Sequence, residues 1–147
     1  MNIHILPTDK PTRLFTSNSE LILAGYPKTT FKTGKNIAIT SNETVVKEND
    51  WWIDIITNSI FKATEEDVLS VNEDGLPDNF KKIILTTDPD LIKDGVQAID
   101  DDFLEWFVKN SSCEFVEVQK GFADGTAYGY NFLDYKIIIP KEETGEK

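Results

Sequence analysis

The chain has 147 residues, 39% of them hydrophobic, and a formal net charge of −11 at pH 7. Nine Phe, four Tyr and three Trp supply enough large apolar surface to exclude a disordered chain. The negative charge disfavours nucleic-acid or membrane binding over the whole surface. For this length we expect one globular domain over residues 1–140 and a flexible polar tail over 141–147.

Signals for compartment and redox state are few. Cys113 is the single cysteine of the sequence, so an internal disulfide or a cysteine-based zinc site is excluded and a free buried thiol is expected. The first residues lack the basic and long apolar segments of a signal peptide or a membrane span. We therefore expect a cytoplasmic protein with no membrane partner.

Short predicted strands fill the first half of the chain. Ile3 and Ile5 alternate with polar residues before Pro7, which predicts a half-buried strand, and the polar segment 16–19 between apolar residues predicts a hairpin. Further strands are expected over 36–40, 51–56 and 60–62. Such closely spaced strands favour a small antiparallel sheet or half-open barrel.

The second half mixes strands and helices. Residues 64–79 are mostly polar and are expected to form an exposed strand or a connection, whereas 81–87 is the clearest strand. Asp88, Pro89 and Gly95 mark the start and the stop of a short helix. Two last strands are expected over 114–119 and 135–139, joined by a Gly-rich connection over 121–129.

One main amphipathic helix is predicted over about residues 101–110. Phe103 and Phe107 are four residues apart and give this helix an aromatic face, which must be buried against the sheet. If Asp102 is the N-cap, Glu105 completes an acidic capping box. The expected fold class is therefore α+β, a small and mostly antiparallel sheet packed by this helix.

No catalytic motif is present in the sequence. The one histidine, His4, lies in the first predicted strand, and no Gly-rich loop opens a helix with a lysine behind it. Six aspartates between Asp88 and Asp102 suit a hard cation by residue type, but their spacing does not fit an EF-hand loop. Helix capping explains most of them, so we expect no metal, no cofactor and no enzyme activity. Metal-dependent hydrolysis at this cluster is the weakest of three hypotheses.

The charge is distributed unevenly along the chain. Residues 1–47 carry six basic and three acidic side chains, a net charge of +3, which leaves −14 for the rest. Trp51 and Trp52 are neighbours in a predicted strand, so one indole is expected in the core and the other outward. An outward indole near basic side chains could stack a base. The speculative ligand-binding residues are Lys28, Lys32, Lys35, Trp51 and Trp52.

Six segments of the chain form a recognisable set: IHILPTDKPTRL at 3–14, ITS at 39–41, ENDW at 48–51, KIILTTDPDLI at 82–92, GVQAIDDDFLEWFVKN at 95–110 and YKIIIPKEE at 135–143. Together they resemble a family of small uncharacterised proteins of bacteriophages and Bacteroidota genomes. The resemblance implies a phage context but no activity and no catalytic residues. Asn49 replaces the usual Gly of that family and still tolerates a left-handed turn, and Ser111 replaces a frequent Pro.

Two functions from different classes remain open. The leading hypothesis is a non-enzymatic phage-type accessory protein that binds a host or phage protein, through its acidic C-terminal two-thirds. The alternative is a small β-barrel that binds nucleic acid or a nucleotide through the basic N-terminal third and Trp51 or Trp52.

Overall fold

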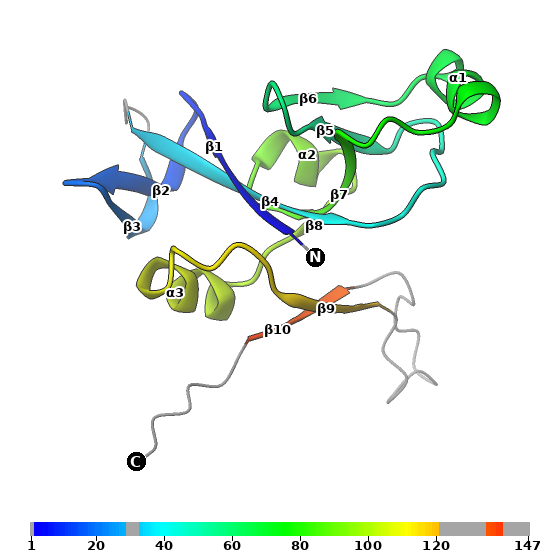
Figure 1. The fold of residues 1–147 in the computed structure, drawn as a ribbon. Coiled ribbons are helices and arrows are strands. Elements are labelled where there is room, and N and C mark those ends of the chain that lie inside the picture. Colours follow the sequence, from blue (N-terminus) through cyan, green and yellow to red (C-terminus); the bar gives the residue numbers. More distant parts are fainter. Residues whose placement is uncertain (1, 29–32, 121–134, 140–147) are drawn as a thin grey trace, which may run out of the picture.

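The fold, given by a computed structural model that describes residues 2–28, 33–120 and 135–139, is one large sheet with a two-stranded ribbon beside it (Figure 1). The large sheet contains β1 (Asn2–Pro7), β2 (Thr12–Ser17), β3 (Glu20–Lys28), β4 (Gly34–Ser41), β5 (Trp51–Asp54), β6 (Ser59–Lys62), β7 (Phe80–Thr86) and β8 (Gln97–Ala98). The ribbon pairs β9 (Glu117–Lys120) with β10 (Tyr135–Ile138). The helices among the described residues are α1 (Glu65–Asp74), α2 (Pro89–Lys93) and α3 (Asp101–Lys109).

Strand β7 lies inside the large sheet, whose main order is β3-β2-β4-β7-β5-β6. In addition, β1 pairs along β4, with Ile3 opposite Ile39, and the short β8 pairs with β7. Every pairing of the sheet is antiparallel except that of β7 with β8. The sheet has free ends at β3 and β6 and is not a closed barrel. The predicted α+β class with a mostly antiparallel sheet is confirmed.

Residues with left-handed backbone conformation lie in the turns of two hairpins. Asn18 and Ser19 have φ angles of 53° and 68°, as a two-residue hairpin loop between β2 and β3 requires. Asn58 has φ 62° just before β6, and Asn49 has φ 77° just ahead of β5. Asparagine tolerates this region better than most residues, so the hairpin predicted at 16–19 and the left-handed turn expected at Asn49 are both confirmed.

The two faces of the sheet are covered by different helices. On one face, Phe103 and Phe107 of α3 are fully buried against Ile37 and Ile39, and their two rings stack with centroids 5.5 Å apart. On the other face, Leu91 of α2 belongs to a smaller core cluster with strand residues. The aromatic face predicted for the main helix is therefore buried as expected.

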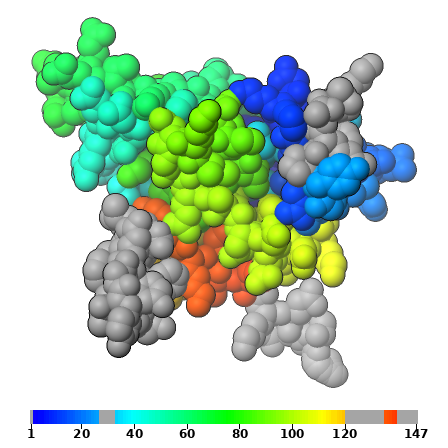
Figure 2. Space-filling view, turned by 180° about the vertical axis from the view of Figure 1, so that it is seen from behind, coloured from blue at the N-terminus to red at the C-terminus, as the bar shows by residue number. Residues whose placement is uncertain are grey.

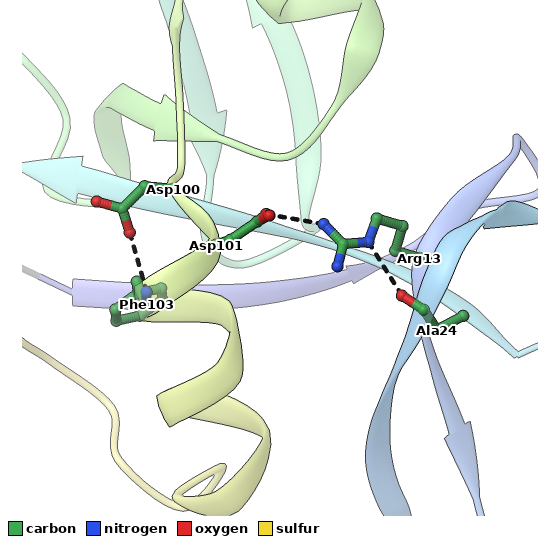
Figure 3. A network of polar contacts seen from close by, with 5 residues as sticks. All are labelled: Arg13, Ala24, Asp100, Asp101 and Phe103. Atoms are coloured by element: carbon green, nitrogen blue, oxygen red, sulfur yellow. Dashed lines mark hydrogen bonds and ion pairs between the residues drawn. The ribbon is translucent and has the colours of Figure 1, made fainter.

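The N-terminus of α3 is capped by a different aspartate from the one predicted. The Asp100 side chain accepts a hydrogen bond of 2.9 Å from the backbone N–H of Phe103, whereas Asp102 is an exposed first-turn residue. Of the three successive aspartates, Asp100 has the extended backbone that an N-cap needs. Asp101 instead binds Arg13, whose Nε also donates to the Ala24 carbonyl (Figure 3).

The prediction of an exposed strand or connection over residues 64–79 is wrong, because α1 occupies most of it. Thr64 accepts from the backbone N–H of Asp67 at 3.2 Å, and the Asp67 carboxylate accepts from the Thr64 backbone N–H at 2.8 Å. This reciprocal capping box satisfies two backbone donors at the helix start. Val68 and Val71, three residues apart, then turn to one side and pack toward Trp52.

Replacing Phe107 by Ala should cost about 3–5 kcal/mol of unfolding free energy, because a fully buried ring leaves a cavity beneath α3. The matched control is Glu105→Ala on the exposed side of the same helix, expected to change stability by less than about 0.5 kcal/mol. Urea unfolding followed by circular dichroism measures both. Equal and small effects of the two substitutions would show that α3 does not seal the sheet.

Candidate functional site

The two adjacent tryptophans of β5 lie on opposite sides of the strand and line two separate hollows. Trp52 is 1% exposed, and Trp51 is half-buried. Successive side chains of a strand point to opposite faces, so this difference follows from strand geometry. The prediction of one core indole and one outward indole is confirmed.

The first hollow, here named the α1 cleft, lies between α1 and the ends of β5, β6 and β7. It measures about 250 Å³, and its apolar lining is Val46, Trp52, Phe61, Val71, Leu76, Pro77 and Phe80. The Phe61 and Phe80 rings meet edge to face with centroids 5.2 Å apart. Asp67 and Asp74 belong to its polar lining. The lining of the cleft is therefore rich in aromatic rings, and its charged side chains are both carboxylates.

Helix α1 covers this cleft only loosely. None of its residues is buried, and Leu69 on α1 is 56% exposed. Val45, on the connection between β4 and β5, is 61% exposed. Figure 2 shows the green α1 residues projecting at one corner of the molecule. The Nε1 of Trp52 is buried with no hydrogen-bond acceptor among the described residues. Residues 63–80 contain six carboxylates and no Lys, Arg or His.

The second hollow, here named the Trp51 pocket, measures about 400 Å³ and is built from four separated chain segments. Its side chains are Glu43, Lys47, Asn49, Asp50, Trp51, Lys82, Asp94, Gln97 and Tyr135, with Ile83, Ile84, Gly95 and Val96. The Trp51 indole donates to Asp94 at 2.8 Å, and Lys62 pairs with Asp94 at 2.9 Å. The hydrogen bond from Lys62, which has the largest effect, and the one from Trp51 hold the pKa of Asp94 below its usual range.

Lys82 and Tyr135 bring titratable groups into the Trp51 pocket. Burial alone would lower the pKa of Lys82, but the carboxylates of Asp50 and Glu43, each 3.4 Å from Nζ, outweigh it and raise the pKa. Burial, followed by the Glu43 charge, raises the pKa of the Tyr135 phenol. Both groups therefore keep their protons at neutral pH, which leaves neither as a base or nucleophile.

Of the basic residues predicted to bind a ligand, the two that the structure describes, Lys28 and Lys35, are placed by strand pairing away from both tryptophans. Lys32 is outside the described residues, and Lys28 pairs through its backbone with Thr12 at the far end of β3. Lys35 lies near the start of β4, opposite Pro7 and Leu14, whereas β4 reaches Lys82 only at its other end. Lys35 lines neither the α1 cleft nor the Trp51 pocket. Among the described members of the predicted set, the lysines and the tryptophans are therefore not brought together.

The aspartates between 88 and 102 serve mainly local structure. Asp88 and Asp100 cap helices, Asp90 pairs with Lys10, Asp94 with Lys62, and Asp101 with Arg13. Across residues 2–28, 33–120 and 135–139, no group of three His, Cys, Asp or Glu side chains is arranged to hold a metal ion. Capping and ion pairing account for most of these acids.

The comparisons with known proteins give no family. No protein-family model matches the chain, and no curated protein or solved structure matches it. Within the described part of the chain, no helix is long and apolar enough to cross a membrane.

His4 should titrate below its usual value of 6.5. It is half-buried on β1, its Nε2 lies 3.2 Å from the Thr40 hydroxyl, and burial followed by the Lys81 charge lowers its pKa. A lowered folded-state pKa gives stability that is present above pH 6.5 and is lost as the pH falls through the folded value.

The loss of stability between pH 7 and pH 5 should therefore be smaller in His4→Gln than in the unmodified chain, when each is followed by thermal unfolding. Proton NMR of the His4 ring gives the midpoint directly. A midpoint at or above 6.5, with identical pH profiles for the two proteins, would contradict the burial argument.

Proposed function

We propose that this chain is a non-enzymatic accessory protein of phage type, acting in the host cytoplasm, that binds a protein partner through the α1 cleft. The observation that carries the proposal is the aromatic, loosely covered cleft in an acidic segment. The phage context rests on the sequence resemblance alone. The binding surface rests on the geometry of α1.

The apolar part of the surface suits a protein partner. Phe61, Phe80 and the buried Trp52 lie under a helix whose own apolar residues stay partly accessible: Val68 is half-buried and Leu69 is 56% exposed. Large rings in a partly formed hollow are the groups that dominate binding energy at protein interfaces. An apolar side chain of a partner would bury surface that α1 leaves open.

The charge of this surface indicates the sign of the charge on the partner. Asp67 and Asp74 lie in the cleft lining, and the whole of residues 63–80 is acidic without a compensating basic residue. Opposite charges across an interface speed up association and exclude wrong partners. The partner is therefore a basic segment with apolar side chains, and its binding weakens as salt screens these charges.

The ionisable groups support a role without catalysis. Lys82 and Tyr135 have raised pKa values and stay protonated, and the lowered pKa of His4 belongs to a side chain outside both hollows. A general base needs a pKa near the working pH and a place beside the substrate. None of these three groups meets both conditions.

The geometry gives less support to nucleotide binding. The Trp51 pocket sets Lys47 and Lys82 against the carboxylates of Glu43, Asp50 and Asp94. Phosphate binding needs excess positive charge or several free backbone donors. This pocket supplies no such excess, so the protein-binding proposal is preferred.

The test is affinity capture from host lysate at low and at high salt, with three variants. Leu69→Ser removes exposed apolar surface from α1, Asp74→Asn removes one charge, and Phe115→Ser is the control, 67% exposed on the segment before β9. We expect a partner that the unmodified protein and Phe115→Ser retain equally. Leu69→Ser and Asp74→Asn should retain it several-fold less.

The salt dependence and the variants must agree for the proposal to stand. High salt should reduce capture by the unmodified protein more than by Asp74→Asn, since one screened interaction is already missing. A partner retained equally by all three variants, or the absence of any partner at low salt, would refute binding through the α1 cleft.

A further inference from the structure

The Trp51 pocket lies at a gap in the pairing of β7. On one edge of β7, β5 pairs as far as Lys82, opposite Trp52, and β8 begins at Gln97, opposite Leu85. Ile83 and Ile84 lie between these two neighbours and form part of the pocket lining. Because β5 and β8 both begin at this gap and run in opposite directions along β7, a crevice is left between their first residues. Concave hollows of this kind are where proteins bind small ligands.

The walls of this pocket are fixed by hydrogen bonds. The Trp51 indole is held by Asp94, which Lys62 holds in turn. The Gln97 side chain donates to the Tyr135 carbonyl and accepts from the Tyr135 backbone N–H, both at 2.6 Å. The orange β10 residues lie against the segment that carries Gln97 (Figure 2). The Trp51 ring and the backbone of Tyr135 are therefore held in place before any ligand arrives.

The polar groups between these walls are close together but not tightly bonded. Lys82 Nζ is 3.4 Å from both the Glu43 and the Asp50 carboxylates, longer than the roughly 2.7–2.9 Å of a tight charge-assisted hydrogen bond. The Oδ2 of Asp50 is buried, and its ion-pair contact with Lys82 Nζ, its one polar contact among the described residues, is too poorly aligned to count as a hydrogen bond. Donors and acceptors thus alternate within one small space and can still bond a third group.

The charges of the pocket are already compensated within the protein. Lys82 lies between two carboxylates, and Asp94 is paired with Lys62. An anion would have to displace a carboxylate from Lys82, and a cation would have to displace Lys82 itself. A neutral ligand that both donates and accepts hydrogen bonds avoids either cost.

We propose that the Trp51 pocket binds a neutral, hydroxyl-rich ligand of the monosaccharide class. Its hydroxyl groups bond to Glu43, Asp50 and Lys82, and its apolar C–H face packs on Trp51 and Tyr135. The volume of about 400 Å³ falls near the small end of ligand pockets, roughly 300–1,000 Å³. This site is separate from the α1 cleft and does not depend on the proposed protein partner.

The experiment is a titration calorimetry panel on the full chain. The probes are D-glucose, D-galactose, D-mannose and N-acetyl-D-glucosamine, with AMP, inorganic phosphate and putrescine as anionic and cationic comparators. We expect at least one neutral sugar to bind with a millimolar dissociation constant and more tightly than every charged probe. Saturation-transfer NMR on that sugar should show its ring C–H protons nearest to the protein.

Variants connect the binding to the pocket. Trp51→Ala and Asp50→Asn should each weaken the sugar about tenfold or more, whereas Leu69→Ser on α1 should leave its affinity unchanged. Glu43→Gln, at a carboxylate whose side chain is 38% exposed, should also weaken the sugar and serves as a further variant if either of the first two lowers the melting temperature. The proposal is overturned if no sugar binds, if AMP or putrescine binds more tightly than every sugar, or if the pocket variants bind like the unmodified protein.

Discussion

The pairing of β7 is the constraint on which the rest of the structure depends. One edge of this strand is occupied by β4, and the other is shared by β5 and β8, which leave Ile83 and Ile84 between them. The same strand contributes Ile84 and Leu85 to the core under α3 and Ile83 to the core under α2. Its first residue, Phe80, lines the α1 cleft. The seven residues of β7 therefore contribute to both hollows and to the cores under α2 and α3.

Much of the fold is predictable because local patterns agree with the final structure. The alternation of apolar and polar residues identifies β1. Ile5 is nevertheless 38% exposed, because the segment after α3 reaches β1 only near Ile3, whose N–H donates to the Glu114 carbonyl. The Asp88-Pro89 pair and Gly95, which has φ 113°, mark α2 because capping and left-handed stops are properties of single residues. The aromatic spacing of α3 similarly required burial on one side.

The rest needed information that single residues do not carry. Thr64 and Asp67 form a capping-box pattern, which indicates the start of α1. The polar composition of the segment indicates a connection instead, and the two signals conflict. Lys82 and Tyr135 carry no local signal, because their surroundings come from segments that only the sheet brings together. Lys35 is grouped with the tryptophans in the predicted ligand site, but the pairing of β4 places it at the opposite end of that strand from Lys82.

The central claim is that two adjacent indoles serve two different sites, and the most direct test is an NMR titration of nitrogen-15-labelled protein followed at the indole N–H signals. The ligands are a basic amphipathic peptide of Lys and Leu and, separately, the sugar that binds most tightly. The account predicts that the peptide shifts the Trp52 signal and leaves Trp51 in place, that the sugar does the reverse, and that Trp106 responds to neither. Movement of Trp51 and Trp52 together with either ligand would contradict it.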